Sequence, residues 1–156
     1  IFMRHRIVVE VSAGSAGVTA ACRQSALEVA DPWDVLYGPQ FDLLVPKQQK
    51  KLIRLISSGH VYLVWLGTPC TSFSQARSPL RMSHDVSLPL PGLSARDREL
   101  FEHGSALAEF TATVIIAAHL AGVYFVVENP YSSTLWQFPS LARALASTSA
   151  GVRCLA

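Results

Sequence analysis

Cysteine is scarce in this sequence, and charge is both sparse and nearly balanced. The 156 residues include three cysteines, Cys22, Cys70 and Cys154, with neither C-x-x-C spacing nor a flanking histidine pattern. We therefore expect no disulfide framework, no structural zinc site and no metal cofactor, and a reducing compartment. Thirteen Lys and Arg against eleven Asp and Glu leave a formal charge of +2, so contacts with nucleic-acid phosphates must come from a local cluster.

The sequence also lacks the pattern of a secretory signal. Arg-His-Arg follows Met3 with no apolar run behind it. The longest uncharged stretch, residues 110–127, reaches the length of a membrane span, but it contains His119 and Gly122 and is better explained by a helix, a glycine turn and a strand. We expect an intracellular protein, nuclear or cytoplasmic, that is not secreted and does not enter a membrane.

Hydrophobic residues make up 50% of the chain, which is typical of one compact domain, and neither a repeat nor a linker divides it. Short apolar runs alternate with helical patterns, which predicts an α/β fold with a parallel sheet, helices on both faces and ligands at the carboxyl ends of the strands. The run 61–66 is expected to be buried on both faces. Strands are predicted at 7–11, 27–30, 61–66 and 123–127, with a further one beginning at 152–155, and helices at 18–26, from Pro46 to Gly59, from Ser94 to Leu120 and at 141–146.

A glycine-bearing turn, Glu10 to Gly17, follows the first predicted strand. Small residues there let backbone N–H groups approach a ligand, although they also let a helix pack closely on a sheet. An acid about twenty residues beyond the first glycine commonly binds a ribose, and Asp34 has that spacing from Gly14, with Asp31 as a competing candidate. Trp33 could stack on a purine or pack in the core.

Two further polar clusters follow predicted strands. Pro69-Cys70 comes after the run 61–66, and a cysteine at such a strand end is either a nucleophile or a small core residue. Glu128-Asn129 follows the strand at 123–127. A carboxyl group at that position must face solvent, pair with another group or serve in binding or catalysis. An irregular segment, 71–93, is long enough to be functional or mobile.

In this order, Glu10 to Gly17, Pro69-Cys70 with Phe73-Ser74, and Glu128-Asn129 resemble three motifs of the cytosine-C5 DNA methyltransferases. The resemblance covers about residues 7–145. It implies a Rossmann-like methyltransferase sheet and S-adenosylmethionine as the cofactor. It also implies that the enzyme transfers a methyl group to C5 of cytosine in DNA through a covalent adduct with Cys70, with a base held outside the duplex.

The resemblance also implies roles for particular residues. Cys70 would be the nucleophile, and Glu128 with Asn129 would hold the cytosine ring. Asp34 and Asp42 would contact the ribose and the adenine, and the segment 71–93 would close as a lid over nucleic acid. The implied cofactor-binding residues are Glu10, Ser12, Ala13, Gly14, Gly17, Trp33, Asp34, Asp42, Gly67 and Pro69. The implied nucleic-acid contacts are Ser72, Ser74, Arg77 and Arg81, the two arginines being ordinary surface charges otherwise.

The sequence departs from the family pattern at several points. Ser12 replaces a usual Phe, Ala16 a usual Gly, Thr71 a common Gln and Pro130 a usual Val. No Gln-x-Arg-x-Arg motif or target-recognition region is present, so we expect residues 1–156 to be a single catalytic domain whose C-terminal part is missing. The alternatives are the same chemistry on RNA, a catalytically silent domain that binds S-adenosylmethionine or nucleic acid, and a structural module that binds neither.

Overall fold

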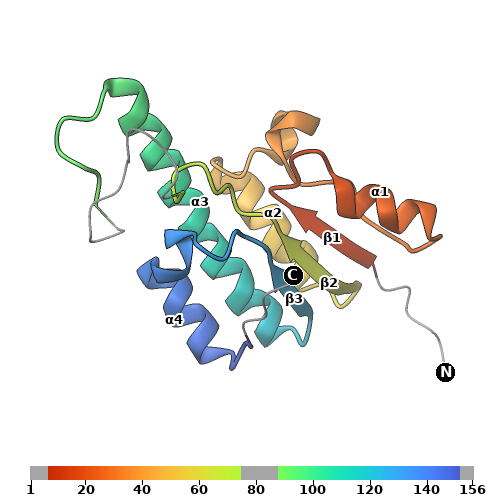
Figure 1. Ribbon diagram of the computed structural model, residues 1–156. Helices are drawn as coiled ribbons and strands as arrows, with labels where there is room; N and C mark the ends of the chain where they lie inside the picture. Colours follow the sequence, from red (N-terminus) through yellow and green to blue (C-terminus); the bar gives the residue numbers. More distant parts are fainter. Residues whose placement is uncertain (1–6, 75–87, 152–156) are drawn as a thin grey trace. The chain divides into compact units, whose positions relative to one another are not determined.

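The computed structural model describes residues 7–74 and 88–151, which form an α/β fold (Figure 1). Three strands alternate with helices, as the sequence predicts. The strands are β1 (Ile7–Val11), β2 (Val61–Leu66) and β3 (Tyr124–Val127). The helices are α1 (Gly17–Gln24), α2 (Pro46–Ile56), α3 (Ala95–Leu120) and α4 (Pro139–Ser147), with short 3-10 turns η1 (Val35–Tyr37), η2 (Pro39–Phe41) and η3 (Thr134–Gln137).

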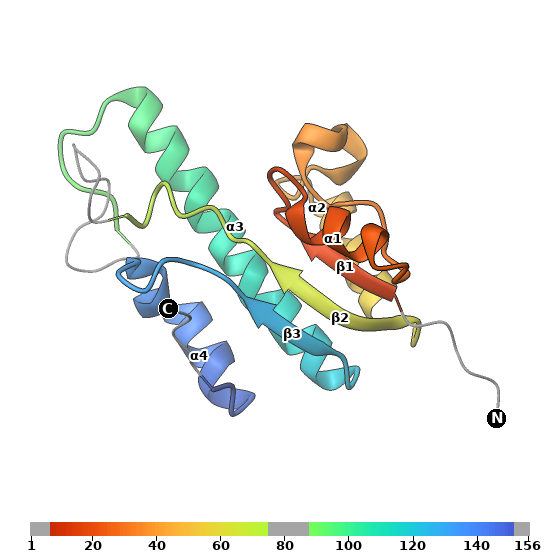
Figure 2. The same cartoon turned by 45° about the vertical axis from the view of Figure 1, so that its right-hand side comes forward.

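The three strands form a parallel sheet in the order β1, β2, β3 (Figure 2). Val11 pairs with Leu66, and Leu66 pairs with Val127, so the carboxyl ends of all three strands meet at one edge. On its other side β1 makes parallel bridges to Val29 and Trp33. The spatial order is therefore residues 29–33, β1, β2, β3, and the chain reverses its direction of progress across the sheet between β1 and β2.

The predicted strand at 27–30 is wrong as a continuous element. Its backbone meets β1 only through isolated bridges at Val29 and Trp33. Pro32 lies between them and has no N–H to donate, so a regular ladder cannot run through this segment. The hydrogen bonds on either side of Pro32, from Ala30 N–H to Val8 O (2.9 Å) and from Trp33 N–H to Glu10 O (2.9 Å), still hold the segment beside β1.

Helices lie on both faces of this sheet. α1 covers one face, and α2 with the end of α3 covers the other (Figures 1 and 2). Right-handed crossovers between parallel strands require this arrangement once the chain reverses between β1 and β2. The fully buried side chains Val9, Leu52, Ile56, Val64, Val114, Ile115 and Ala118 form the core between the layers.

Strand β2 is less buried than its sequence predicts. Val61, Val64 and Leu66 are buried, but Tyr62 is 44% exposed. Tyr62 meets Tyr124 of β3 edge to face, with ring centroids 5.2 Å apart. Tyr124 is itself 64% exposed, so this pair of rings is open to solvent, and the expectation of complete burial on both faces is wrong at this point.

The described chain divides into two compact units. The first contains residues 7–68 and 114–128, and the second contains 69–74, 88–113 and 129–151. α3 contributes residues to both. Its start follows a reciprocal cap, in which Asp97 N–H donates to Ser94 Oγ (3.1 Å) and Ser94 Oγ–H donates to Asp97 Oδ2 (2.8 Å).

The second unit has its own apolar core. Phe73, Leu135, Phe138 and Leu141 are buried there, and the rings of Phe73 and Phe138 meet edge to face at 5.7 Å. α4 begins with Pro139, which suits the first turn of a helix because its missing N–H would have had no partner. The strand predicted at 152–155 and most of the segment 71–93 lie outside the described residues.

Candidate functional site at the carboxyl edge

The carboxyl edge of the sheet collects the chemistry-bearing segments of the first unit. Gly67 N–H donates to Val11 O (3.0 Å), which holds the end of β2 against the end of β1. Glu128 N–H donates to Leu66 O (2.9 Å), which fixes the start of the Glu128 segment beside β2, and its side chain is exposed. Ligands in parallel sheets bind where the strand order reverses, so the ends of β1 and β2 are the expected position of a site.

The turn after β1 is built from alternating left-handed residues. Ser12, Gly14 and Ala16 have φ values of 53°, 50° and 54°. Glycine adopts this conformation freely, but Ser12 and Ala16 carry a Cβ that makes it unfavourable by about 1 kcal/mol each. The turn therefore stores backbone strain directly at the edge where a ligand is expected.

The side chain of Glu10 connects the end of β1 to the first turn of α1. Its side chain is buried, and its two carboxylate oxygens accept hydrogen bonds from Val18 N–H (3.2 Å) and Thr19 N–H (2.6 Å). Ala16 stands at the cap position of α1 and has no side-chain acceptor, so the acid from β1 supplies the cap instead. The sequence predicts Glu10 as a cofactor contact, whereas the structure uses both of its oxygens inside the protein.

Asp34 is likewise occupied by the backbone. Its Oδ2 accepts from Gly14 N–H (3.0 Å) and its Oδ1 from Leu36 N–H (3.0 Å), which ties the segment after Trp33 to the glycine turn. The twenty-residue spacing that predicts a ribose contact thus joins Asp34 to Gly14 through a hydrogen bond within the protein. Asp42 plays a similar local part, since its Oδ1 accepts from Leu44 N–H (2.9 Å) ahead of α2.

Trp33 is 3% exposed and does not present its ring at a ligand surface. The ring meets Phe41 edge to face at 5.3 Å, and Lys51 Nζ lies 5.6 Å from its centroid. Of the two interpretations that the sequence leaves open, the structure agrees with the packing role. Stacking of Trp33 on a purine stays a prediction, and in this structure the ring is buried beside Phe41.

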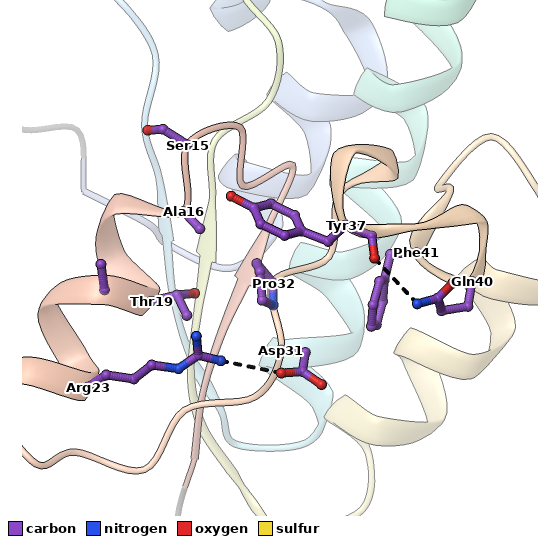
Figure 3. Close-up of a pocket in the computed structure, with 10 residues that line it drawn as sticks. Ser15, Ala16, Thr19, Arg23, Asp31, Pro32, Tyr37, Gln40 and Phe41 are labelled. Atoms are coloured by element: carbon purple, nitrogen blue, oxygen red, sulfur yellow. Dashed lines mark hydrogen bonds and ion pairs between the residues drawn. The ribbon is translucent and has the colours of Figure 1, made fainter.

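A cavity of about 520 Å³ opens beside the same turn (Figure 3). Its wall includes Thr19 and Arg23 from α1, Asp31, and Tyr37 from η1. The Tyr37 hydroxyl donates to Gly14 O (2.9 Å), so its ring bridges the cavity and the turn. The other lining residues are Ser15, Ala16, Ala20, Pro32, Gln40 and Phe41.

Two groups in this cavity remain available to a ligand. Thr19 is 1% exposed, and its Oγ1 has no hydrogen-bond partner within the described chain. Asp31 pairs with Arg23 at 3.3 Å, but their side chains are 75% and 57% exposed, so this pairing is weak. A buried hydroxyl without a partner is costly, and a ligand with polar groups would satisfy it.

None of the ten residues predicted from the sequence to bind the cofactor lines this cavity. The open alternative Asp31 does line it, together with Ser15 and Ala16 of the predicted turn. The lining residues Thr19, Arg23, Tyr37 and Gln40 are not predicted from the sequence. The helical spacing of Thr19, Ala20 and Arg23, which places them on one face of α1, is a signal that could have found the first two.

Cys70 lies in the second unit, in a tightly held turn. Its thiol is free and its residue is half-buried, and its carbonyl accepts from Phe73 N–H (2.9 Å). Phe73 O in turn accepts from both the N–H and the hydroxyl of Thr134, each at 2.9 Å. These bonds fix the backbone that follows the cysteine.

The turn after Cys70 also rests closely on α3. A Cβ added to Gly104 would lie 2.7 Å from Ser72 Oγ, so only glycine allows this approach. Ser72 Oγ–H donates to Leu100 O (2.9 Å), and the residue is 5% exposed. The prediction of a nucleic-acid contact by Ser72 is therefore wrong, because its hydroxyl is directed into the protein. Ser74 is half-buried, and Arg77 and Arg81 lie outside the described residues.

Asn129 opens the second unit's last segment and is half-buried. As the sequence predicts, the strand ends before Pro130, since β3 stops at Val127. The segment is then held in place by Trp136, whose Nε1–H donates to Pro130 O (2.9 Å). Pro69 and Gly67 are both half-buried, and a Cβ on Gly67 would lie 3.0 Å from Ser12 O.

Comparison with known proteins yields no relative. No family model, no curated protein and no solved structure matches the chain. Among residues 7–74 and 88–151, no group of three His, Cys, Asp or Glu side chains gathers as a metal ion would require, and no helix there is long and apolar enough to cross a membrane.

Proposed function

We propose that this chain is the catalytic portion of an S-adenosylmethionine-dependent methyltransferase that acts on C5 of cytosine in DNA. One observation carries the proposal. The strained glycine turn, the chain leading to Cys70, and Glu128 all follow parallel strands whose carboxyl ends meet at one edge, where the strand order reverses. This order is compatible with a Rossmann-like methyltransferase sheet.

The glycine turn favours a cofactor that brings no phosphate to it. Phosphate-binding turns leave the first N–H groups of the following helix free for the anion. Here Glu10 already occupies the N–H groups of Val18 and Thr19 with a negative charge. A dinucleotide pyrophosphate would be repelled at this position, whereas a nucleoside carrying a positive charge would be attracted.

The cavity beside α1 fits such a nucleoside. Its volume lies within the range of small-molecule sites, and it combines an apolar ring, Tyr37, with the unpartnered hydroxyl of Thr19 and the exposed carboxylate of Asp31. Asp31 would accept hydrogen bonds from the ribose hydroxyls and release Arg23. When bound, S-adenosylmethionine supplies an electrophilic methyl group.

Cys70 is the nucleophile in this proposal. Cys70 is the second residue after Thr68 of the first unit, so its Cα lies within about 8 Å of the Thr68 Cα by chain connectivity. The hydrogen bonds around Phe73 hold the following turn in place, which lowers the entropy lost when the thiolate meets a substrate. The ordered backbone after Cys70 supports its proposed role as the nucleophile.

Glu128 would hold the base under attack. Its backbone is fixed to the end of β2 through Leu66 O, and its exposed carboxyl group is free to contact N3 and the exocyclic amine of a cytosine. That contact becomes stronger as negative charge develops on the ring, so it stabilises the transition state more than the bound substrate.

The proposed reaction balances without a metal or an oxidant. The Cys70 thiolate forms a bond to C6, and the electron pair displaced from the C5–C6 double bond makes C5 nucleophilic. C5 would then take the methyl group from the sulfonium centre of S-adenosylmethionine, and the electron pair of the broken sulfur–carbon bond would stay with the departing S-adenosylhomocysteine. Loss of the C5 proton to a base restores the double bond and expels Cys70 as a thiolate, which returns the residue to its starting state.

The test is covalent trapping on a DNA duplex that contains 5-fluorocytosine. Fluorine at C5 cannot leave as a cation, so an enzyme of this kind stays attached to the base through its cysteine. We expect a denaturant-resistant adduct when S-adenosylmethionine is present, and its complete loss in Cys70→Ser. Cys22→Ser is the matched control, because Cys22 is buried in α1, and it should retain the adduct.

The possible results separate the candidate functions. An adduct in Cys70→Ser as strong as in the parent chain would refute the proposed nucleophile. An adduct on RNA but not on DNA would assign the same chemistry to the other nucleic acid. Binding of S-adenosylmethionine in calorimetry without any adduct or methyl transfer would identify a silent cofactor-binding domain.

A further inference from the structure

Helix α2 carries a row of positive charge that the proposed reaction does not use. Lys47, Lys50, Lys51 and Arg54 stand at positions i, i+3, i+4 and i+7, which places them on one face of the helix, and all four are exposed. We call these four residues the basic stripe. The chain has a formal charge of only +2, so this concentration is local.

No acidic side chain neutralises the stripe from within its own segment. The sequence has no Asp or Glu between Asp42 and Asp85, so α2 lacks the i, i+4 partners that usually accompany lysines on a solvated helix. In the part of the chain that the structure describes, the ion pair joins Arg23 to Asp31 and does not involve α2. Like charges this close repel one another, which favours the binding of an anion.

Lys51 is anchored while the other three cations are free to reach outward. Its Nζ lies 5.6 Å from the Trp33 ring centroid and 5.9 Å from that of Phe41, which holds it against the aromatic pair. Lys47, Lys50 and Arg54 have no such partner in the described residues. They are therefore the groups that a partner would engage first.

The opposite face of α2 rules out insertion into a lipid surface. Amphipathic helices that bind membranes bury an apolar face among the acyl chains. In α2 that face is already used, because Leu52 and Ile56 are 0% exposed and pack against the sheet. Only the charged face of α2 is exposed for binding, and its partner must therefore carry negative charges at regular intervals.

We infer that the basic stripe binds the phosphate backbone of nucleic acid. Seven residues of helix span about 10 Å, which matches the axial rise of about three phosphates along one strand of a duplex. Such contacts fix the position of a duplex without reading its sequence. The inference does not depend on methyl transfer, since α2 carries none of the proposed catalytic or cofactor-binding residues.

The experiment measures binding of a fluorescein-labelled 20-base-pair duplex by anisotropy over a range of salt concentrations, without S-adenosylmethionine. The test variant is Lys47→Gln/Lys50→Gln/Arg54→Gln, which leaves Lys51 on its aromatic pair. Each phosphate contact contributes about 0.9 to the slope of log K against log salt. We expect the magnitude of this slope to be smaller by about 2 to 3 in the variant, and the affinity at low salt to be at least tenfold lower.

The matched control removes the same charge elsewhere. Arg96→Gln/Arg98→Gln/Arg143→Gln neutralises three exposed arginines on α3 and α4, and we expect it to keep most of the slope. Circular dichroism and thermal unfolding establish that both triple variants are folded. Lys47→Arg/Lys50→Arg preserves the charge and should retain parent-like binding, which separates loss of charge from loss of the lysine side chains.

Three outcomes would overturn the inference. The slope would be unchanged in the test variant if α2 does not contact the duplex. Equal losses in the test and control variants would show a general effect of net charge. Loss of binding to vesicles of phosphatidylcholine with 30% phosphatidylserine, with duplex binding intact, would assign the stripe to an anionic membrane instead. A chain that fails the trapping test can still show the expected slope, so the two proposals fail separately.

Discussion

At the scale of single residues, the part that an acidic side chain plays depends on how many of its lone pairs the protein itself uses. Glu10 and Asp34 each accept two hydrogen bonds from backbone N–H groups around the glycine turn. Asp31 has only an exposed pairing with Arg23. The first two acids therefore hold the turn in shape, and Asp31 is the acid that would contact the ribose in the proposed function.

This difference predicts that substitution of Asp34 mainly lowers stability, whereas the matched substitution of Asp31 mainly weakens cofactor binding. Asp34→Ala removes two acceptors of backbone N–H groups and should lower the free energy of unfolding by about 1 to 2 kcal/mol. Asp31→Ala breaks an exposed ion pair and should lower the free energy of unfolding by less than about 1 kcal/mol. The same substitution should lower the affinity for S-adenosylmethionine at least tenfold. Urea unfolding and titration calorimetry measure the two quantities. Loss of cofactor affinity in Asp34→Ala, with Asp31→Ala unaffected in both measurements, would contradict the assignment.

At the scale of elements, the turn from Val11 to Gly17 combines a strained backbone with a cap supplied from elsewhere. Ala16 has a φ of 54° and no side-chain acceptor, although it stands where α1 begins. α1 starts there because Glu10 reaches its free N–H groups, which local propensity alone does not explain. A residue with poor local preference is kept in place by a tertiary contact.

The strain at Ala16 predicts that glycine is the better residue at this position. Ala16→Gly should raise the free energy of unfolding by about 1 kcal/mol, because glycine adopts the left-handed conformation without steric conflict. Ala13→Gly makes the same chemical change in the same turn at a residue without positive φ, and it should lower stability by about 0.5 to 1 kcal/mol. Urea midpoints compare the two variants, and destabilisation by both would exclude strain at Ala16.

At the scale of the whole molecule, the order of the strands decides which loops share an edge. The chain crosses from β1 to the segment 29–33 on one side and returns to β2 on the other, so the ends of β1 and β2 lie together without a connecting crossover between them. Gly67 makes this approach possible, since its Cα faces Ser12 O at a distance that leaves little room for a side chain.

Gly67→Ala tests how closely that edge must be packed. The added Cβ would lie 3.0 Å from Ser12 O, so the ends of β1 and β2 must separate by a few tenths of an ångström. We expect a loss of about 1 to 2 kcal/mol in stability together with weaker cofactor binding and slower methyl transfer. Gly151→Ala is the control, because nothing lies within 4 Å of its added Cβ, and it should leave all three nearly unchanged.

The sequence by itself determined the elements of this protein and their order. Periodicity, proline, glycine and the Ser94-Asp97 cap act over a few residues, and they predicted β1, β2, β3 and all four helices close to their observed bounds. It also placed Cys70 and Glu128 after strands, as the structure shows. The predicted strand at 27–30 forms only an isolated bridge at Val29, and Pro32 after it has no N–H with which a regular ladder could continue.

Only the tertiary structure decided what individual side chains do. Whether Glu10 or Asp34 contacts a ligand depends on which backbone donors lie near it, and those donors are distant in sequence. The burial of Trp33 follows from a bridge to β1, and the cavity beside α1 requires walls from two separate segments. The basic stripe is readable as a spacing, but its exposure follows from the apolar face of α2 being held against the sheet. Hydrogen-bond partners and solvent access are properties of the folded chain, since they arise between segments that no local pattern connects.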